Sequence, residues 1–82
     1  MVDPIVEGFK ANVASAQLRH RSVAPAKGAF LAYRASVIAD RDRQLGKLDT
    51  SDPRRLQLIS YADSVIEHAR ANGVRIYAPE AA

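Results

Sequence analysis

The amino-acid sequence predicts an all-α fold, a small three-helix bundle with a short extended C-terminal segment. Apolar residues recur at helical spacing over three long segments, and a proline or glycine stands near almost every boundary between them. The 82 residues contain no cysteine, so neither a disulfide nor a thiolate metal site can replace a hydrophobic core. We expect one domain over 1–82, with helices at about 4–21, 25–45 and 53–71 and an extended tail over 74–82.

The first helix is expected to begin at Asp3-Pro4. Aspartate accepts hydrogen bonds from free backbone amides, and a proline at the first helical position has its φ already set. The apolar residues of this segment share one helical face: Ile5, Phe9, Val13 and Ala16. Pro25 limits the helix at its other end, because the residue before a proline is disfavoured in the α conformation.

The second helix is expected to run from Pro25 to Leu45, with Gly46 as its C-terminal breaker. Its apolar residues recur at intervals of seven, with one-residue neighbours, which predicts a broad apolar face: Phe30, Leu31, Val37, Ile38 and Leu45. Of these, Phe30 is expected in the core, as is Phe9 of the first helix.

The third helix has the clearest boundaries. Ser51-Asp52-Pro53 is typical of a helix start, and Asn72-Gly73 is typical of a stop with a left-handed residue. Between them, a set of apolar residues forms one face: Leu58, Ile59, Ala62, Val65, Ile66 and Ala69. The short turns favour an up-down-up bundle, and a helix-turn-helix arrangement of the same helices remains open.

The residues after Gly73 change pattern to Val74-Arg75-Ile76-Tyr77, a short alternating run that favours extended structure. One strand cannot form a sheet alone. This segment therefore either packs as an extended tail across the bundle or pairs with another chain.

Positive charge is concentrated in the first part of the chain. No carboxylate stands between Glu7 and Asp40, and residues 1–34 contain five Lys or Arg against two acidic residues. Residues 35–82 contain seven of each sign. This asymmetry is explained either by a solvated basic surface or by attraction to an acidic protein or to phosphates.

For an acidic protein partner, we expect the basic stretch to steer the encounter, and Arg and Tyr side chains to hold the complex, because both are enriched at interfaces. The candidate partner-binding residues are Arg19, Arg21, Lys27, Tyr33, Arg34, Arg75 and Tyr77.

The alternative is a nucleic-acid-binding module that contacts phosphates, because each neutralised phosphate releases counterions. Arg54 and Arg55 stand at the positive end of the third helix, where a phosphate can also bind. The candidate nucleic-acid-binding residues are Lys10, Arg19, Arg21, Lys27, Arg54 and Arg55.

Nothing in the sequence predicts catalysis, a cofactor or a metal. His20 and His68 fall on different helices, and neither is near a catalytic or phosphate-binding motif. Asp63 and Glu67 lie one turn from each other and near Arg70, so ion pairs explain them.

The longest apolar run has about five residues, far short of the ~20 that span a bilayer, so we expect no membrane partner. The N-terminus resembles no secretory signal, and the absence of cysteine suits a reducing compartment, so cytoplasm is the default.

These observations predict a small non-enzymatic interaction protein that binds another macromolecule, in first place a protein. We expect a regulator, adaptor or inhibitor, and size and alanine content suggest a bacterial or phage accessory protein. Self-association into a homo-oligomer is a further expectation, because the core is small and the segment 74–77 offers a strand edge.

Overall fold

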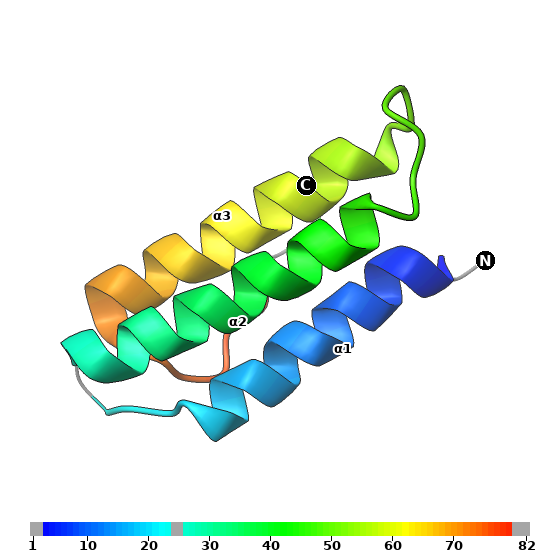
Figure 1. The fold of residues 1–82 in the computed structure, drawn as a ribbon. Helices are drawn as coiled ribbons and strands as arrows, with labels where there is room; N and C mark the ends of the chain where they lie inside the picture. The colour runs from blue at the N-terminus through cyan, green and yellow to red at the C-terminus, as the bar shows by residue number, and fades with distance from the viewer. Residues whose placement is uncertain (1–2, 24–25, 80–82) are drawn as a thin grey trace.

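The computed structural model describes residues 3–23 and 26–79 of the chain (Figure 1). They form three helices: α1 at Pro4–Arg19, α2 at Lys27–Leu45 and α3 at Arg54–Asn72. No strand occurs within the described residues. The predicted all-α three-helix bundle is therefore confirmed.

The three helices run up, down and up. α2 is antiparallel to both α1 and α3, and the long axis of the molecule follows the helices (Figure 1). The principal extents are 37 × 22 × 17 Å. The chain is therefore an elongated bundle with two distinct ends, and it does not adopt a helix-turn-helix arrangement.

α1 begins where the sequence predicts. The Asp3 carboxylate accepts hydrogen bonds from the amides of Ile5 at 2.9 Å and Val6 at 3.3 Å, which satisfies free donors of the first turn. The helix ends at Arg19, two residues before the predicted end, with His20 as its C-cap. It ends early because the chain turns so that the amide of Ser22 donates to the carbonyl of Val74, at 2.7 Å.

The other two helices start slightly later than predicted. α2 begins at Lys27, and the predicted start at Pro25 lies outside the described residues. α3 begins at Arg54, one residue after the predicted start, because Pro53 is its N-cap and the carboxylate of Asp52 accepts the Arg54 amide at 2.9 Å. The C-terminal ends of α2 and α3 agree with the sequence to within one residue.

The core is formed by the inner faces of the three helices and one tail residue. Its fully buried large side chains are Phe9, Val13, Tyr33, Val37, Leu58, Val65 and Val74. Phe30, expected in the core, instead packs against its edge and is partly exposed. The reason is that Tyr33 and Val37 occupy the inner face of α2, so Phe30 lies on the side of the helix that faces α3.

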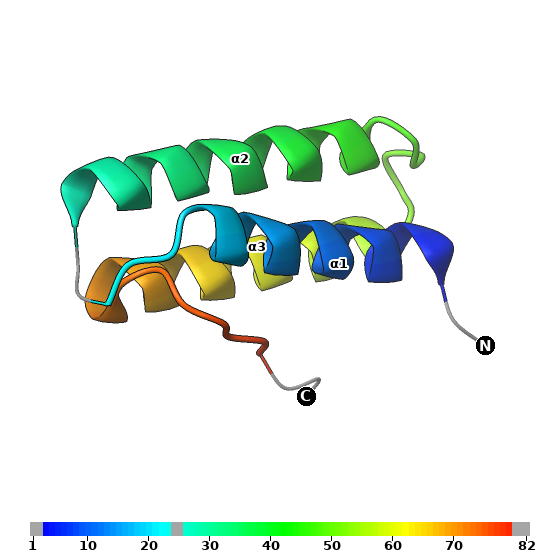
Figure 2. The ribbon, with the colours of Figure 1, turned by 90° about the horizontal axis from the view of Figure 1, so that it is seen from below.

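The tail packs along α1 and α3, below the bundle in Figure 2. Val74 is fully buried, and its amide and carbonyl both bond to Ser22, the amide reaching the Ser22 hydroxyl at 3.1 Å. The first of the two predicted alternatives, an extended tail across the bundle, is therefore what the structure shows. The hydrogen bonds of Val74 are made within the chain.

The tail leaves α3 at Gly73, which has φ 87° and ψ 164°. The predicted left-handed stop is correct in the sign of φ, but ψ is extended, so the residue redirects the chain rather than closing a helical turn. Almost no residue other than glycine adopts this combination of φ and ψ without strain.

We expect Gly73→Ala to lower the free energy of unfolding by about 1–3 kcal/mol, because a side chain at this φ is strained. Gly28→Ala is the matched control, since its added methyl would meet nothing within 4 Å and the position is helical. That control should be neutral or stabilise by up to about 1 kcal/mol. Urea denaturation of both variants checks this, and equal effects would contradict the role of Gly73.

Candidate functional site

The topology brings two distant basic segments to one end of the bundle. α1 ends, α2 begins and α3 ends there, so residues 17–34 and 66–79 meet at this end, which we call the basic end (Figure 1). These residues include six Lys or Arg and one carboxylate, Glu67. The remaining described residues, 3–16 and 35–65, contain six cations and seven carboxylates. The charge asymmetry of the sequence is therefore also an asymmetry in space.

The cations of the basic end differ in their surroundings. Arg19, Arg21, Lys27 and Arg34 are exposed, and no carboxylate of the described residues lies within ion-pair distance of them. Arg70, by contrast, forms an ion pair with Glu67 one turn earlier on α3. The hydrogen bonds of this pair lower the pKa of Glu67 and raise that of Arg70.

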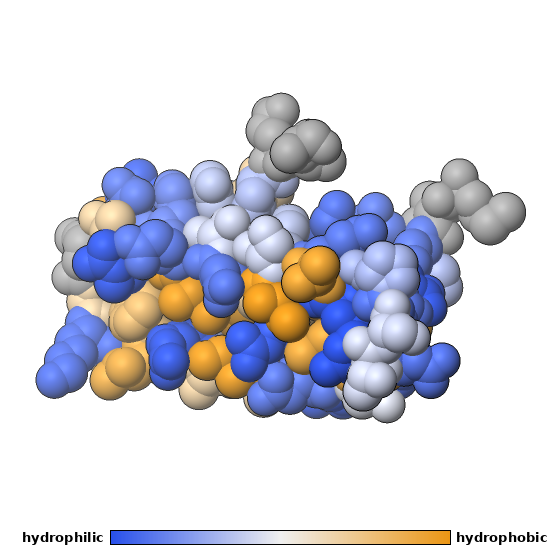
Figure 3. Space-filling model, turned by 90° about the horizontal axis from the view of Figure 1, so that it is seen from above, coloured by the Kyte–Doolittle hydropathy of each residue, from blue (hydrophilic) through white to orange (hydrophobic). Residues whose placement is uncertain are grey.

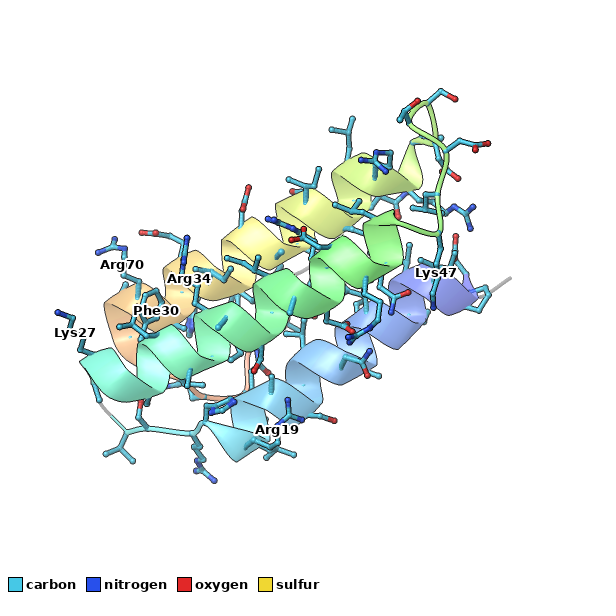
Figure 4. All side chains as sticks on the ribbon, viewed as in Figure 1. Arg19, Lys27, Phe30, Arg34, Lys47 and Arg70 are labelled. Carbon is cyan, nitrogen blue, oxygen red and sulfur yellow. The ribbon has the colours of Figure 1, made fainter. Side chains whose placement is uncertain are left out.

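Figure 4 places Lys27, Phe30, Arg34 and Arg70 where α2 begins and α3 ends, and Arg19 at the same end on α1. Exposed apolar side chains accompany these cations. Leu31 on α2 is 49 % exposed, and Val23 in the turn before α2 is 86 % exposed. The basic end therefore combines cations without ion-pair partners with apolar contact area, which is the composition of a protein-binding patch.

Tyr33, a candidate partner-binding residue, belongs to the core. Its side chain is fully buried, and its hydroxyl accepts a hydrogen bond from the amide nitrogen of Gln17 at 3.2 Å. Burial raises the pKa of Tyr33. The expectation that Tyr33 contacts a partner is therefore wrong, because the residue lies one turn before buried Val37 on the inner face of α2.

Arg54 and Arg55, two candidates for a phosphate site, both make contacts within the chain. Arg54 lies between the carboxylates of Asp52 and Asp3, with nitrogen–oxygen distances of 2.7 and 3.1 Å. Arg55 donates to the carbonyl of Leu45 at 3.0 Å and so caps the end of α2. Both of these candidates for nucleic-acid binding therefore have partners within the chain, where they join the ends of the helices.

The remaining basic candidates do not share one face. Lys10 lies with its amine 5.5 Å from the centre of the Tyr61 ring, on the side where α1 meets α3. Arg19 is nine positions further along α1, which is about two and a half turns and therefore the opposite side of the helix. Lys10 thus lies away from the basic end, whereas Arg19, Arg21 and Lys27 remain together there.

The two tail candidates have different environments. The Tyr77 ring stacks on His68 of α3, with ring centres 3.8 Å apart and an angle of 5° between the planes. Arg75 is exposed and donates to the carbonyl of Val23 at 3.1 Å, which ties the tail to the turn between α1 and α2. Tyr77 therefore holds the tail, and Arg75 adds positive charge to the basic end.

The buried side chain of Gln17 joins three segments of the chain, although Gln17 is not among the residues predicted from the sequence. Its amide nitrogen donates to the Tyr77 carbonyl at 2.7 Å as well as to Tyr33, and its carbonyl oxygen accepts the Tyr77 amide at 3.3 Å. The spacing of the sequence could have predicted the burial of Gln17, because this residue stands four positions after Val13 and next to Ala16, on the buried face of α1. A polar residue at such a position needs an internal partner.

A row of apolar side chains lies between α2 and α3 on the face that Figure 3 shows from above. All are partly or substantially exposed, although each is large and apolar. We call this row the α2–α3 stripe, and its members are Leu31, Ile38, Leu45, Ile59 and Ile66. Figure 3 shows hydrophobic side chains gathered along the middle of this face, interrupted by charged ones.

No group of three or more His, Asp or Glu side chains is placed to hold a metal ion within 3–23 and 26–79. The ring nitrogen of His20 lies 3.3 Å from the hydroxyl of Ser36, and His68 stacks on Tyr77, so the two histidines make structural contacts in separate places.

Within the same part of the chain, no helix has both the length and the apolar character needed to cross a bilayer.

Comparisons of the chain with protein-family models, with curated proteins and with solved structures found no match.

We expect Gln17→Leu to lower the free energy of unfolding by about 1–3 kcal/mol, because it leaves buried polar groups of Tyr33 and Tyr77 without partners. Hydrogen exchange of the Tyr77 amide should become faster in the same variant. Gln57→Leu on the exposed side of α3 is the matched control and should have little effect on either measurement. Unchanged exchange at Tyr77 would contradict the role of Gln17.

The ion pairs of Arg54 make the free energy of unfolding depend on pH in the acidic range. The hydrogen bond from Arg54 to Asp52 lowers the pKa of that carboxyl. Burial raises the pKa of Asp3, but hydrogen bonds from backbone amides and Arg54 outweigh it, so the pKa is lowered overall. A carboxyl with a lowered folded-state pKa stabilises the fold above its unfolded value, here 3.8, and this contribution is lost as the pH falls through the folded value.

We therefore expect the stability of Arg54→Gln to fall less steeply than that of the wild type as the pH is lowered below about 4.5. Urea denaturation at a series of pH values measures this. Lys47→Gln removes the same charge from a residue without a carboxylate partner among those described, and it should keep the wild-type slope. Parallel curves for wild type and Arg54→Gln would show that the ion pairs contribute nothing.

Proposed function

We propose that this chain is a small non-enzymatic interaction protein that binds an acidic surface of another protein through its basic end. In this role it acts as a regulator, adaptor or inhibitor by occupying its partner. The observation that supports the proposal is the excess of six cations over one carboxylate at one end of the bundle, next to exposed apolar side chains. A reducing compartment such as the cytoplasm suits a chain without cysteine.

The proposed binding has two physical parts. The field of the basic end accelerates encounter with an acidic surface, an effect that weakens as salt increases. Once the surfaces meet, Leu31 and Val23 lose their contact with water, and arginine side chains form hydrogen bonds with carboxylates. Arg19, Arg21, Lys27 and Arg34 form no ion pair with the described residues that would have to break before they bind.

A protein partner suits this surface better than a nucleic acid. A phosphate backbone is contacted by a continuous set of cations and uses little apolar area. Here Arg54 and Arg55 are engaged within the chain, Lys10 lies on another side, and exposed apolar side chains stand among the cations that remain. Nucleic-acid binding is therefore an outcome that the test must be able to detect.

Photo-crosslinking at matched lysine positions tests the proposal. A photoreactive amino acid replaces either Lys27 at the basic end or Lys47 at the other end, which Figure 4 shows far apart along the bundle. In an extract of the cells that produce the protein, we expect one protein to be crosslinked from position 27 and not from position 47. Adding Arg21→Glu, a change at the basic end, should reduce that product at least about tenfold, as a lost charge-assisted contact does.

Two results would overturn the proposal. One is equal crosslinking from positions 27 and 47, and the other is a crosslinked product that a nuclease removes. A titration with labelled random-sequence duplex at about 50 and 200 mM salt complements the nuclease arm, because phosphate-driven binding falls steeply over this interval. Binding of duplex with such a salt dependence would favour the nucleic-acid alternative.

A further inference from the structure

The three grooves between the helices differ in what covers them. Between α1 and α2, polar pairs face each other: Asn12 donates to Asp40 at 3.0 Å, and His20 lies 3.3 Å from Ser36. Between α1 and α3, the tail packs over the helices, with Tyr77 stacked on His68. Between α2 and α3, the groove carries the α2–α3 stripe, and no described segment of the chain covers it. The third groove is therefore the open one.

The spacing of the stripe is that of helices that pack on further helices. Leu31, Ile38 and Leu45 follow each other at seven residues on α2, and Ile59 and Ile66 do the same on α3. A seven-residue repeat keeps one side of a helix directed at a neighbouring helix over several turns. The stripe therefore suits another pair of helices laid along it.

The stripe is also symmetric about its own centre. Arg55 reaches the carbonyl of Leu45, so position 45 of α2 stands level with about position 55 of the antiparallel α3. By the same register Ile38 stands level with about position 62, which lies between Ile59 and Ile66. A two-fold axis that crosses the bundle at this level brings Leu31 of one copy opposite Leu45 of the other, and Ile59 opposite Ile66. It also brings the Ile38 side chains of the two copies into contact. Such a self-complementary patch is what a two-fold dimer requires.

From this symmetry we propose that a second copy of this chain packs on the α2–α3 stripe, with the two bundles antiparallel and the two Ile38 side chains in contact at the two-fold axis. The resulting interface contains the apolar stripe of each copy together with the charged residues that interrupt it.

Charge favours the antiparallel arrangement. A two-fold axis along the bundle would bring the two basic ends together, with five net positive charges on each. An axis across the bundle instead places each basic end beside the opposite end of the second copy, where Arg54 lies between the carboxylates of Asp3 and Asp52. Arg34 and Asp42 stand four residues before and after Ile38, so Arg34 of one copy lies level with Asp42 of the other, which pairs with Arg41 within its own chain.

The length of the bundle leaves room for an interface of standard size. The Cα atoms of the whole chain extend 37 Å along the longest axis and 22 and 17 Å across it, so a lengthwise face can provide contacts on the scale of the roughly 800 Å² per partner that such an interface buries. The basic ends remain at the two far ends of the dimer, so Arg19, Arg21, Val23 and Lys27 stay accessible, whereas Leu31 and Arg34 lie in the dimer interface. This inference does not depend on the proposed function.

Sedimentation equilibrium of the purified chain tests the dimer. We expect a mass twice the 8.9 kDa of one chain, and a dimer dissociation constant that rises at least about tenfold in Ile38→Glu, because two carboxylates then meet at the axis. Leu18→Glu is the matched control, since Leu18 is an exposed leucine on α1 outside the stripe, and it should leave the constant unchanged. Circular dichroism verifies that both variants remain helical.

A second experiment uses the absence of cysteine in the natural chain. Ile38→Cys should form a disulfide-linked dimer rapidly on mild oxidation, because residues at the axis meet their own copies. Leu31→Cys mixed with Leu45→Cys should form the mixed disulfide faster than either forms its own. The charge exchange Arg34→Asp with Asp42→Arg should restore the dimer that Arg34→Asp alone weakens.

A chain that stays monomeric up to about 0.5 mM would overturn the inference, since a standard-size interface is populated at such concentrations. A dimer that persists unchanged in Ile38→Glu, or that crosslinks equally through Leu18→Cys, would overturn it as well, because it would then use another face. Neither result bears on the crosslinking from Lys27, so the two proposals fail separately.

Discussion

The buried side-chain amide of Gln17 is the contact on which the arrangement of α1, α2 and the tail depends. One primary amide donates to the Tyr33 hydroxyl and to the Tyr77 carbonyl, and it accepts the Tyr77 amide. Without it, the fully buried phenol of Tyr33 and the partly buried backbone of Tyr77 would lose hydrogen-bond partners. Among the described residues, every buried side-chain nitrogen or oxygen atom has a hydrogen-bond partner.

The up-down-up topology determines where the charge accumulates. The acid-free stretch of the sequence spans the end of α1 and the start of α2, and the turn between them returns the chain to the same end of the bundle. α3 then finishes at that end, adding Arg70 and Arg75. At the other end, Arg54 lies between two carboxylates, so this cluster carries one net negative charge. The protein is therefore electrically polarised along its length, and its apolar stripe runs along the same direction.

Local patterns in the sequence were sufficient to predict the helices. The Asp3 cap, the end of α2 at Leu45 and the positive φ of Gly73 all depend on neighbours within a few residues. The errors concern contacts between distant residues. Tyr33 finds its partner on another helix, and Arg54 binds a carboxylate 51 positions away, so composition and spacing around either residue contained no sign of these contacts. The basic end was predicted as a stretch of sequence, but its contribution from α3 required the topology.

The separation between the tail and its partners along the chain has a consequence for folding. The bonds from Gln17 and Ser22 to the tail join residues 60 and 52 positions apart, whereas neighbouring helices meet through short turns. Contacts of low sequence separation form first, because they close smaller loops. We therefore expect the helices to associate early and the tail to dock last. By the same reasoning the tail is the segment that opens most easily in the native protein, so exchange of the Val74 amide reports the free energy of tail undocking rather than that of global unfolding.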